Sequence, residues 1–154
     1  MGTGGSESGN LRLTAIVKKR MPGLTAAKAA ALCEAATVCL DDQGHESGVR
    51  LDVHGSTATA YALVHHEPDD SQRRTYADDE EATEEGATAI AVAVVLDITE
   101  YLVVERAAKG GGFDYWLGSE IGDFQARLEM SGIRHGSVQE IRGRLRRKQR
   151  RRDR

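Results

Sequence analysis

The segment from Asp78 to Ile98 constrains the fold of this chain more than any other. It opens with a cluster of Asp and Glu and continues as a run of Ala, Val, Ile and Leu. Acidic side chains in a first turn are favourable against the helix dipole, and a helix that is apolar on most sides must be covered by other elements. The sequence therefore predicts a central, buried helix over 78–98. We expect its buried stripe to comprise Ala87, Ala91, Val94 and Ile98.

The composition indicates one globular domain. Of the 154 residues, 40% are hydrophobic and 29% are charged, which is ordinary for a globular chain of this length. The longest apolar stretch, 87–98, is well short of the roughly 20 residues that cross a bilayer. We therefore expect a cytoplasmic protein without a membrane partner. Its expected parts are a flexible Gly/Ser-rich leader over 1–10, a single α/β domain over 11–141 and a basic tail over 142–154.

A second helix is predicted from Thr25 to about Leu40. A Pro-Gly pair breaks the chain just before Thr25, whose hydroxyl can cap the first turn. The two cysteines, Cys33 and Cys39, lie on different sides of this helix, which is a poor geometry for a disulfide. They also lack the CxxC spacing of a redox or zinc site. We expect both to be small buried apolar side chains.

Two strand-like runs over 49–54 and 57–65 predict a β-hairpin. The Gly-Ser pair between them is a typical hairpin turn. The polar segment 68–75 that follows is expected to be a loop, and the short segment 11–17 is ambiguous.

The second half of the chain predicts a three-strand meander and a last helix. Short strand-like runs cover 101–106, 113–117 and 126–131, and a helix is expected from about Ser137. A helix followed by a meander and another helix packs as layers, so the fold class is α/β, more narrowly α+β. In the second strand, Tyr115 and Leu117 should face away from Asp114 and Trp116. For Trp116, packing in the core is favoured over stacking on a base.

Two acidic residues of this meander form the main candidate site. Asp114 lies at the start of the second strand and Glu129 near the end of the third, so the two can lie side by side. Paired carboxylates repel each other unless a cation or a shared proton relieves the repulsion. Mg²⁺ takes such oxygen ligands and keeps waters that a phosphate can displace. The pair therefore predicts a divalent-metal platform for phosphodiester hydrolysis.

The segments GFDYWL at 112–117 and LEMS at 128–131 resemble motifs of the PD-(D/E)xK nuclease superfamily. The resemblance covers about residues 78–150. It implies a restriction-endonuclease-like core of a helix, a three-strand meander and a helix, with Asp114 and Glu129 as catalytic, metal-binding carboxylates and Mg²⁺ as the cofactor. Some members add a carboxylate from the preceding helix, and Glu84 or Glu85 can fill that place, with Glu84 preferred.

The third position of the motif departs from the family. Ser131 stands where the family has a catalytic Lys, and a hydroxyl cannot supply the positive charge that offsets developing negative charge. Lys109, in the loop before Asp114, is the nearest replacement in sequence, and Lys148 is another. The alternative is an inactive relative that keeps the shape and binds a partner.

The net charge of −3 conceals a strong asymmetry. Residues 142–154 carry nine Lys or Arg and one Asp, so the other 141 residues sum to about −11. A basic end on an acidic chain indicates an anionic partner, although a solubilising tail is the alternative. We expect the nucleic-acid-binding side chains to be Arg142, Arg144, Arg146, Arg147, Lys148, Arg150 and Arg151.

Two functions therefore stay open at this point. The first is a metal-dependent nuclease acting on DNA, or a degenerate relative of one. The second is a non-catalytic interaction module, such as an accessory subunit of a multi-protein system, for example a defence system. In that case the basic tail would bind nucleic acid or an acidic protein.

Overall fold

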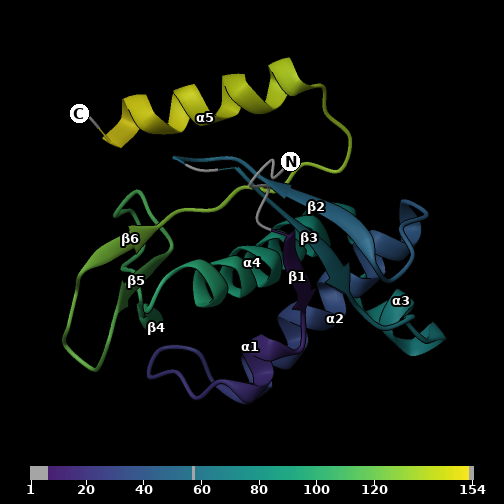
Figure 1. Ribbon diagram of the computed structural model, residues 1–154, viewed down its shortest axis with the longest axis horizontal. Coiled ribbons are helices and arrows are strands. Elements are labelled where there is room, and N and C mark those ends of the chain that lie inside the picture. Colours follow the sequence, from purple (N-terminus) through teal and green to yellow (C-terminus); the bar gives the residue numbers. More distant parts are fainter. Residues whose placement is uncertain (1–6, 57, 153–154) are drawn as a thin grey trace, which may run out of the picture.

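Helix α4 (Asp79–Ile98) lies between two small sheets in the computed structural model of the chain (Figure 1). The structure describes residues 7–56 and 58–152, with the side chains of residues 7, 8, 138 and 148–152 left out. The fold is mixed α+β, as the sequence predicts. In the described part of the chain, no helix is both long and apolar enough to cross a membrane.

The first sheet combines the predicted hairpin with a strand from the N-terminal region. The hairpin strands β2 (Val49–Val53) and β3 (Thr59–Val64) are antiparallel, and β1 (Glu7–Arg12) pairs with β3 in parallel. The start of β1 falls inside the stretch that we expected to be a leader. The reason is pairing and burial, because Leu11 is aligned with Leu63 of β3 and both side chains are buried.

The predicted helix after the Pro-Gly pair is confirmed as α2 (Ala26–Asp42). The Thr25 hydroxyl accepts a hydrogen bond from the Lys28 N–H at 3.1 Å, which caps the first turn. A single helical turn, α1 (Ala15–Lys18), precedes it.

The loop expected over 68–75 is instead largely a short helix, α3 (Asp70–Thr75). A capping box explains the difference. The Asp69 carboxylate accepts from the Gln72 N–H at 2.8 Å, and the Gln72 side chain accepts from the Asp69 N–H at 3.0 Å. The polar composition of this segment therefore reflects helix capping rather than a loop.

The central helix is confirmed, but its buried face differs from the expected stripe. Its N-cap is Asp78, whose carboxylate accepts from the Glu81 N–H at 2.9 Å. An apolar pattern on most sides of a helix does not say which side faces the closest neighbour. Here α2 packs on the face with the smallest residues, while Ile98 is exposed. The buried residues of α4 are Ala82, Gly86, Ala89, Val92 and Ala93.

The predicted meander is confirmed as the antiparallel strands β4 (Leu102–Arg106), β5 (Tyr115–Gly118) and β6 (Ala126–Leu128). Strand β6 ends three residues earlier than expected, so Glu129 and Ser131 lie beyond it. The last helix, α5 (Val138–Arg152), begins where predicted, and the Ser137 hydroxyl accepts from the Glu140 N–H at 3.1 Å.

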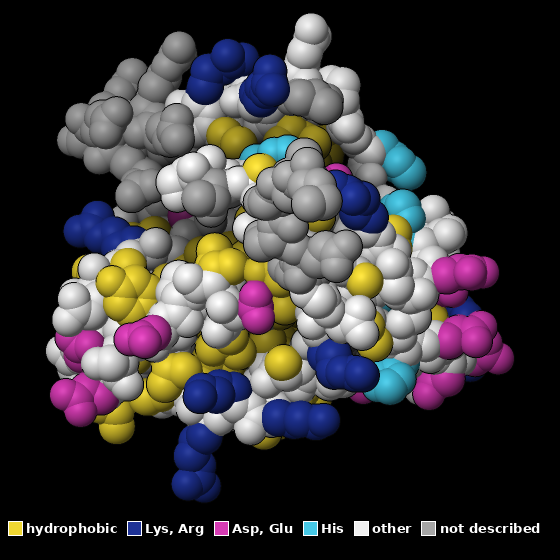
Figure 2. All heavy atoms as spheres, in the orientation of Figure 1, with side chains coloured by type: hydrophobic (Ala, Val, Ile, Leu, Met, Phe, Trp, Pro, Cys, Tyr) yellow, Lys and Arg dark blue, Asp and Glu magenta, His cyan; other side chains and the backbone are white. Residues whose placement is uncertain are grey.

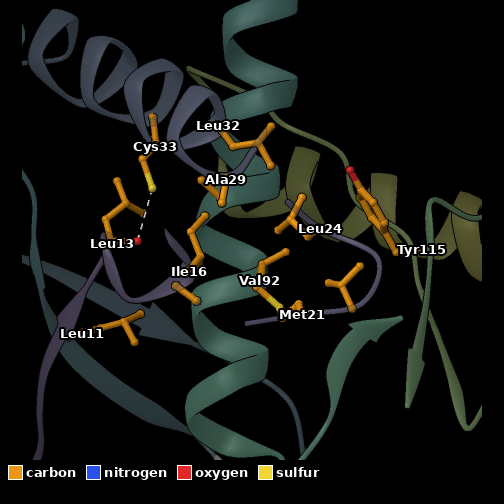
Figure 3. Packing of buried hydrophobic residues seen from close by; sticks show 14 of the residues in the cluster. Leu11, Leu13, Ile16, Met21, Leu24, Ala29, Leu32, Cys33, Val92 and Tyr115 are labelled. Carbon is orange, nitrogen blue, oxygen red and sulfur yellow. Dashed lines mark hydrogen bonds between the residues drawn. The ribbon is translucent and has the colours of Figure 1, made fainter. Parts of the chain in front are cut away.

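One continuous core joins both sheets to the central helices (Figure 3). Cys33 of α2 belongs to it, and its thiol donates to the Leu13 carbonyl at 3.3 Å. Burial raises the pKa of the Cys33 thiol to about 11, so the side chain is a neutral packing group. Neither cysteine is in a disulfide, and Cys39 is only partly buried. The largest fully buried side chains are Leu13, Ile16, Leu32, Leu63, Val92 and Val103.

The contact between α2 and α4 leads to a first prediction. A Cβ added to Gly86 would lie 3.0 Å from the Ala36 Cα and 3.2 Å from its nitrogen, which is backbone that cannot rotate away. We expect Gly86→Val to lower the free energy of unfolding by about 1–3 kcal/mol through overpacking. Denaturant unfolding followed by circular dichroism measures this change.

The matched control is Gly143→Val in α5. A Cβ at Gly143 would meet only the end of the Arg147 side chain, at 3.7 Å. This variant should keep the unfolding midpoint of the parent. Equal losses in the two variants would contradict the close approach of the helices.

Candidate functional site

A cavity of about 600 Å³ opens between the start of α2, the first half of α4 and the β4–β5 strands. Five charged side chains line it, and they come from four separate elements. Two are basic and three are acidic, so the cavity can hold both a cation and an anion. These residues are Lys28, Glu84, Glu85, Arg106 and Asp114.

Asp114 is held in this cavity by the ends of β5 and β6. Its N–H donates to the Leu128 carbonyl at 2.9 Å, and its Oδ2 accepts from the Met130 N–H at 2.7 Å. Its Oδ1 is 3.9 Å from the Arg106 guanidinium, which also lies over the Tyr115 ring. The carboxylate is thus fixed by backbone contacts, and its side chain remains 30% exposed.

The two carboxylates of α4 reach the same cavity. Glu84 and Asp114, two of the carboxylates that the nuclease resemblance implies, thus line one cavity, and Glu85 lines it as well. Glu85 is the less exposed of the two and lies 4.0 Å from the Lys28 Nζ. Glu84 was preferred from sequence because of the expected buried stripe of α4. The observed buried face is a different one, yet both Glu84 and Glu85 line the cavity.

Lys28 is the residue of this site that sequence reasoning missed. It lies on the first turn of α2, far in sequence from the motif residues, and no local pattern marks it. Only the packing of the helices against each other could have indicated that Lys28 belongs to this site. The packing of α2 on α4 brings the Lys28 Nζ within 4.0 Å of the Glu85 carboxylate.

Glu129 does not line the cavity that holds Asp114. It lines a second cavity of about 250 Å³ between α4, the segment after β6 and α5. Side chains in extended chain alternate between two sides, and here Met130 reaches the Asp114 cavity while Glu129 and Ser131 do not. Met130 also borders the second cavity, so the two spaces lie on either side of this segment.

The position that departs from the family motif anchors α5. The Ser131 hydroxyl accepts a hydrogen bond from the Arg144 guanidinium at 2.5 Å, and the same nitrogen donates to the Gly132 carbonyl at 2.8 Å. Lys109, the replacement cation suggested by sequence, is exposed in the β4–β5 loop and lines neither of these two cavities.

The basic residues of α5 divide into one anchor and a set of exposed side chains. Arg144 is the anchor, and Arg142, Arg146 and Arg147 are exposed. The side chains of Lys148, Arg150 and Arg151 lie outside the described residues. Figure 2 shows basic side chains at the edge of the molecule that α5 occupies in Figure 1.

The segment between β6 and α5 is fixed by Arg134. Its guanidinium donates to the Thr83 hydroxyl at 2.7 Å and to Asp42 at 3.0 Å, and it lies 3.4 Å from the Asp79 carboxylate. With only 15% of its side chain exposed, Arg134 joins the end of α2 to the start of α4.

The donor chemistry of the first cavity suits a hard divalent cation. In the described residues, no group of three or more His, Cys, Asp or Glu is placed to hold a metal. Mg²⁺ requires less, because it is often bound by one or two carboxylates together with waters and substrate phosphate. The carboxylates that line this cavity are those of Glu84, Glu85 and Asp114.

No protein-family model, curated protein or solved structure matches this chain. The nuclease resemblance therefore rests on the motif residues alone. Function has to be argued from the geometry of the two cavities and of α5.

The Arg134 contacts lead to a prediction about stability. Arg134→Ala removes charge-assisted hydrogen bonds to two helices and should lower the free energy of unfolding by about 1–3 kcal/mol. The measurement is denaturant unfolding at neutral pH. The control is Arg146→Ala on α5, an exposed arginine whose loss should change stability by less than about 0.5 kcal/mol. Equal stability of the two variants would show that Arg134 does not hold the segment.

Proposed function

We propose that the chain is a nuclease-like, divalent-metal-dependent phosphodiesterase that acts on nucleic acid, DNA in the first instance. One observation carries the proposal: a single cavity joins Glu84 of α4 and Asp114 at the start of β5, with two cations beside them. These are two of the acidic positions that the nuclease resemblance implies. Carboxylates that serve only to keep a surface solvated have no need to share one cavity with each other and with two basic side chains.

Glu84 and Asp114 would hold the Mg²⁺. When bound, the ion supplies a water of lowered pKa and neutralises charge on the phosphate oxygens. The Met130 N–H fixes the orientation of the Asp114 carboxylate through its 2.7 Å hydrogen bond. Orientation of this kind is what a catalytic carboxylate needs from its surroundings.

The two basic residues of the cavity bind the anionic substrate in this proposal. The Arg106 side chain is 63% exposed and the Lys28 side chain 52%, so both can reach a phosphate from solvent. Arg106 also lies close to Asp114, which puts its charge next to the reacting group. The roles of Glu129 and Lys109 stay predictions from the resemblance, since neither lines this cavity.

Helix α5 supplies binding away from the reacting group. Its exposed arginines can contact phosphates without reading sequence, so binding should be salt-dependent and largely independent of base sequence. Because the rest of the chain is acidic overall, α5 is the segment with the strongest attraction for a polyanion.

Substitution of the two carboxylates tests the catalytic proposal. We expect Asp114→Asn and Glu84→Gln each to reduce Mg²⁺- or Mn²⁺-dependent cleavage of DNA by about 10²–10³-fold, because each removes charge needed in the transition state. Cleavage of plasmid DNA, single-stranded DNA and RNA, with and without EDTA, measures the effect. Glu81→Gln is the matched control, since Glu81 is on the same helix, is exposed and does not line the cavity. Undiminished cleavage by Asp114→Asn would place the chemistry elsewhere.

A second candidate function is a non-catalytic nucleic-acid- or protein-binding module. The Ser131–Arg144 hydrogen bond favours it, because the position of the family's catalytic Lys is used here to attach α5. In this alternative the chain is an accessory subunit of a multi-protein system. Its basic helix makes the contact, and the acidic cavity has no catalytic role.

A triple substitution on α5 tests the binding role that both functions share. Replacing Arg142, Arg146 and Arg147 with Ala should weaken DNA binding. If each contacts one phosphate, the slope of log affinity against log salt should fall by about 3. Fluorescence anisotropy with labelled DNA over a salt series measures both quantities.

The charge-matched control replaces three exposed basic residues next to α1, namely Lys18, Lys19 and Arg20. Equal losses in the two triple variants would show an effect of net charge and contradict a specific role for α5. Binding that depends on α5 in a chain that cuts no substrate would favour the second function.

A further inference from the structure

The outward face of the second sheet carries three aromatic rings in a row. Strand β5 points Tyr115 and Leu117 into the core, and Trp116 therefore lies on the opposite face. Phe113 contacts the Trp116 ring edge-on with centroids 4.7 Å apart, and the tilted Phe124 ring has its centroid 4.8 Å from that of Trp116. None of the three rings belongs to the buried core or to the side chains packed against it. We call Phe113, Trp116 and Phe124 the ring platform.

The ring platform is accessible and carries a positive charge. The Phe124 side chain is exposed at 47%, and Phe113 and Trp116 are partly exposed. Arg127, the neighbour of Trp116 on β6, holds its guanidinium over both rings, with the carbon 5.1 Å from the Phe113 centroid and 5.4 Å from that of Trp116. A base that binds here therefore stacks on this guanidinium or displaces it from the ring faces. Aromatic faces beside an arginine are the combination that binds a stacked base and its phosphate together.

Two acidic residues, Asp123 and Glu105, lie near the platform. Asp123 is used within the β5–β6 loop, where its carboxylate accepts from the Ser119 N–H, the Ser119 hydroxyl and the Gln125 amide. These bonds order the loop that presents Phe124. Glu105 lies opposite Trp116 on β4 and is exposed. Its charge disfavours a long phosphate track across the sheet and leaves stacking as the main means of binding.

We propose that the ring platform binds unpaired bases, and that the substrate class of this protein is therefore single-stranded nucleic acid. Bases in a duplex stack on each other and cannot reach protein rings without being extruded. Phe113 directly precedes Asp114 in the chain, so the segment that leads into β5 contributes one residue to the platform and the next to the lining of the candidate cavity. The substrate clause rests on the proposed function, whereas binding of bases by the platform does not.

The single tryptophan of the chain makes the test direct, because its fluorescence reports on the platform. The full chain is titrated with an oligothymidylate single strand in the presence of EDTA, which prevents metal-dependent cleavage. We expect saturable quenching of Trp116 by the single strand and none by a duplex of equal length. A single strand that binds without quenching would overturn the proposal.

Three variants identify stacking as the cause of binding. Phe124→Leu keeps an apolar side chain but removes the ring, and it should weaken oligothymidylate binding by about 5- to 100-fold. Phe124→Tyr keeps the ring and should retain parental affinity, which also shows that the position tolerates substitution. Ile121→Ala is the matched control, because Ile121 is an apolar residue of the same loop, has no ring and is 83% exposed.

The outcomes separate this proposal from its rivals and from the proposed function. Unchanged binding by Phe124→Leu would overturn it. A loss in Ile121→Ala as large as in Phe124→Leu would also overturn it, since it would indicate a general apolar surface that suits a protein partner. Because the titration needs no cleavage, a chain that fails to cut any substrate still gives a clear result for the platform.

Discussion

The close contact between α2 and α4 is the constraint on which the rest of the structure depends. Small residues, with Gly86 against Ala36 at its centre, let the two backbones approach until little space for side chains remains. The packing of these helices also brings Lys28 beside Glu85, and both residues line the Asp114 cavity. Helix α4 of this pair also contacts β1 of the first sheet and β4 of the second. A looser pairing would separate the basic and acidic sides of the cavity.

The sequence predicts the fold class, the meander and the long helices because these follow from local periodicity and capping. It does not predict the buried face of α4, since an apolar pattern on nearly all sides is compatible with several orientations and only the partner helix decides. It also misses α3, where Asp69 and Gln72 stabilise a helix that composition alone describes as a loop. Lys28 could not be assigned to the site for a similar reason, because its role comes from a contact distant in sequence.

The sequence predicts only part of the candidate site. The early end of β6 explains why Asp114 and Glu129 line different cavities instead of forming the expected pair. Asp114 and Glu129 were expected to meet because they are neighbours across two strands. Beyond Leu128, however, the chain alternates so that Met130 turns to the Asp114 cavity, while Glu129 and Ser131 face α5. The other carboxylates that line the Asp114 cavity are Glu84 and Glu85 of α4. Residues that are neighbours in the strand register can therefore line different cavities. Which cavity a side chain lines depends here on how the side chains alternate after β6 has ended.

The α2–α4 contact also determines which pieces of this chain can exist alone. The motif resemblance begins near residue 78, yet the face of α4 with Ala82, Gly86 and Ala89 is covered by a helix that lies entirely before that point. Cutting the chain at the edge of the motif would expose that face to water and remove one basic side chain of the cavity. The limits of the recognisable motif are therefore not the limits of the folding unit. A larger residue at this contact in one helix would therefore have to be matched by a change in the other helix during evolution.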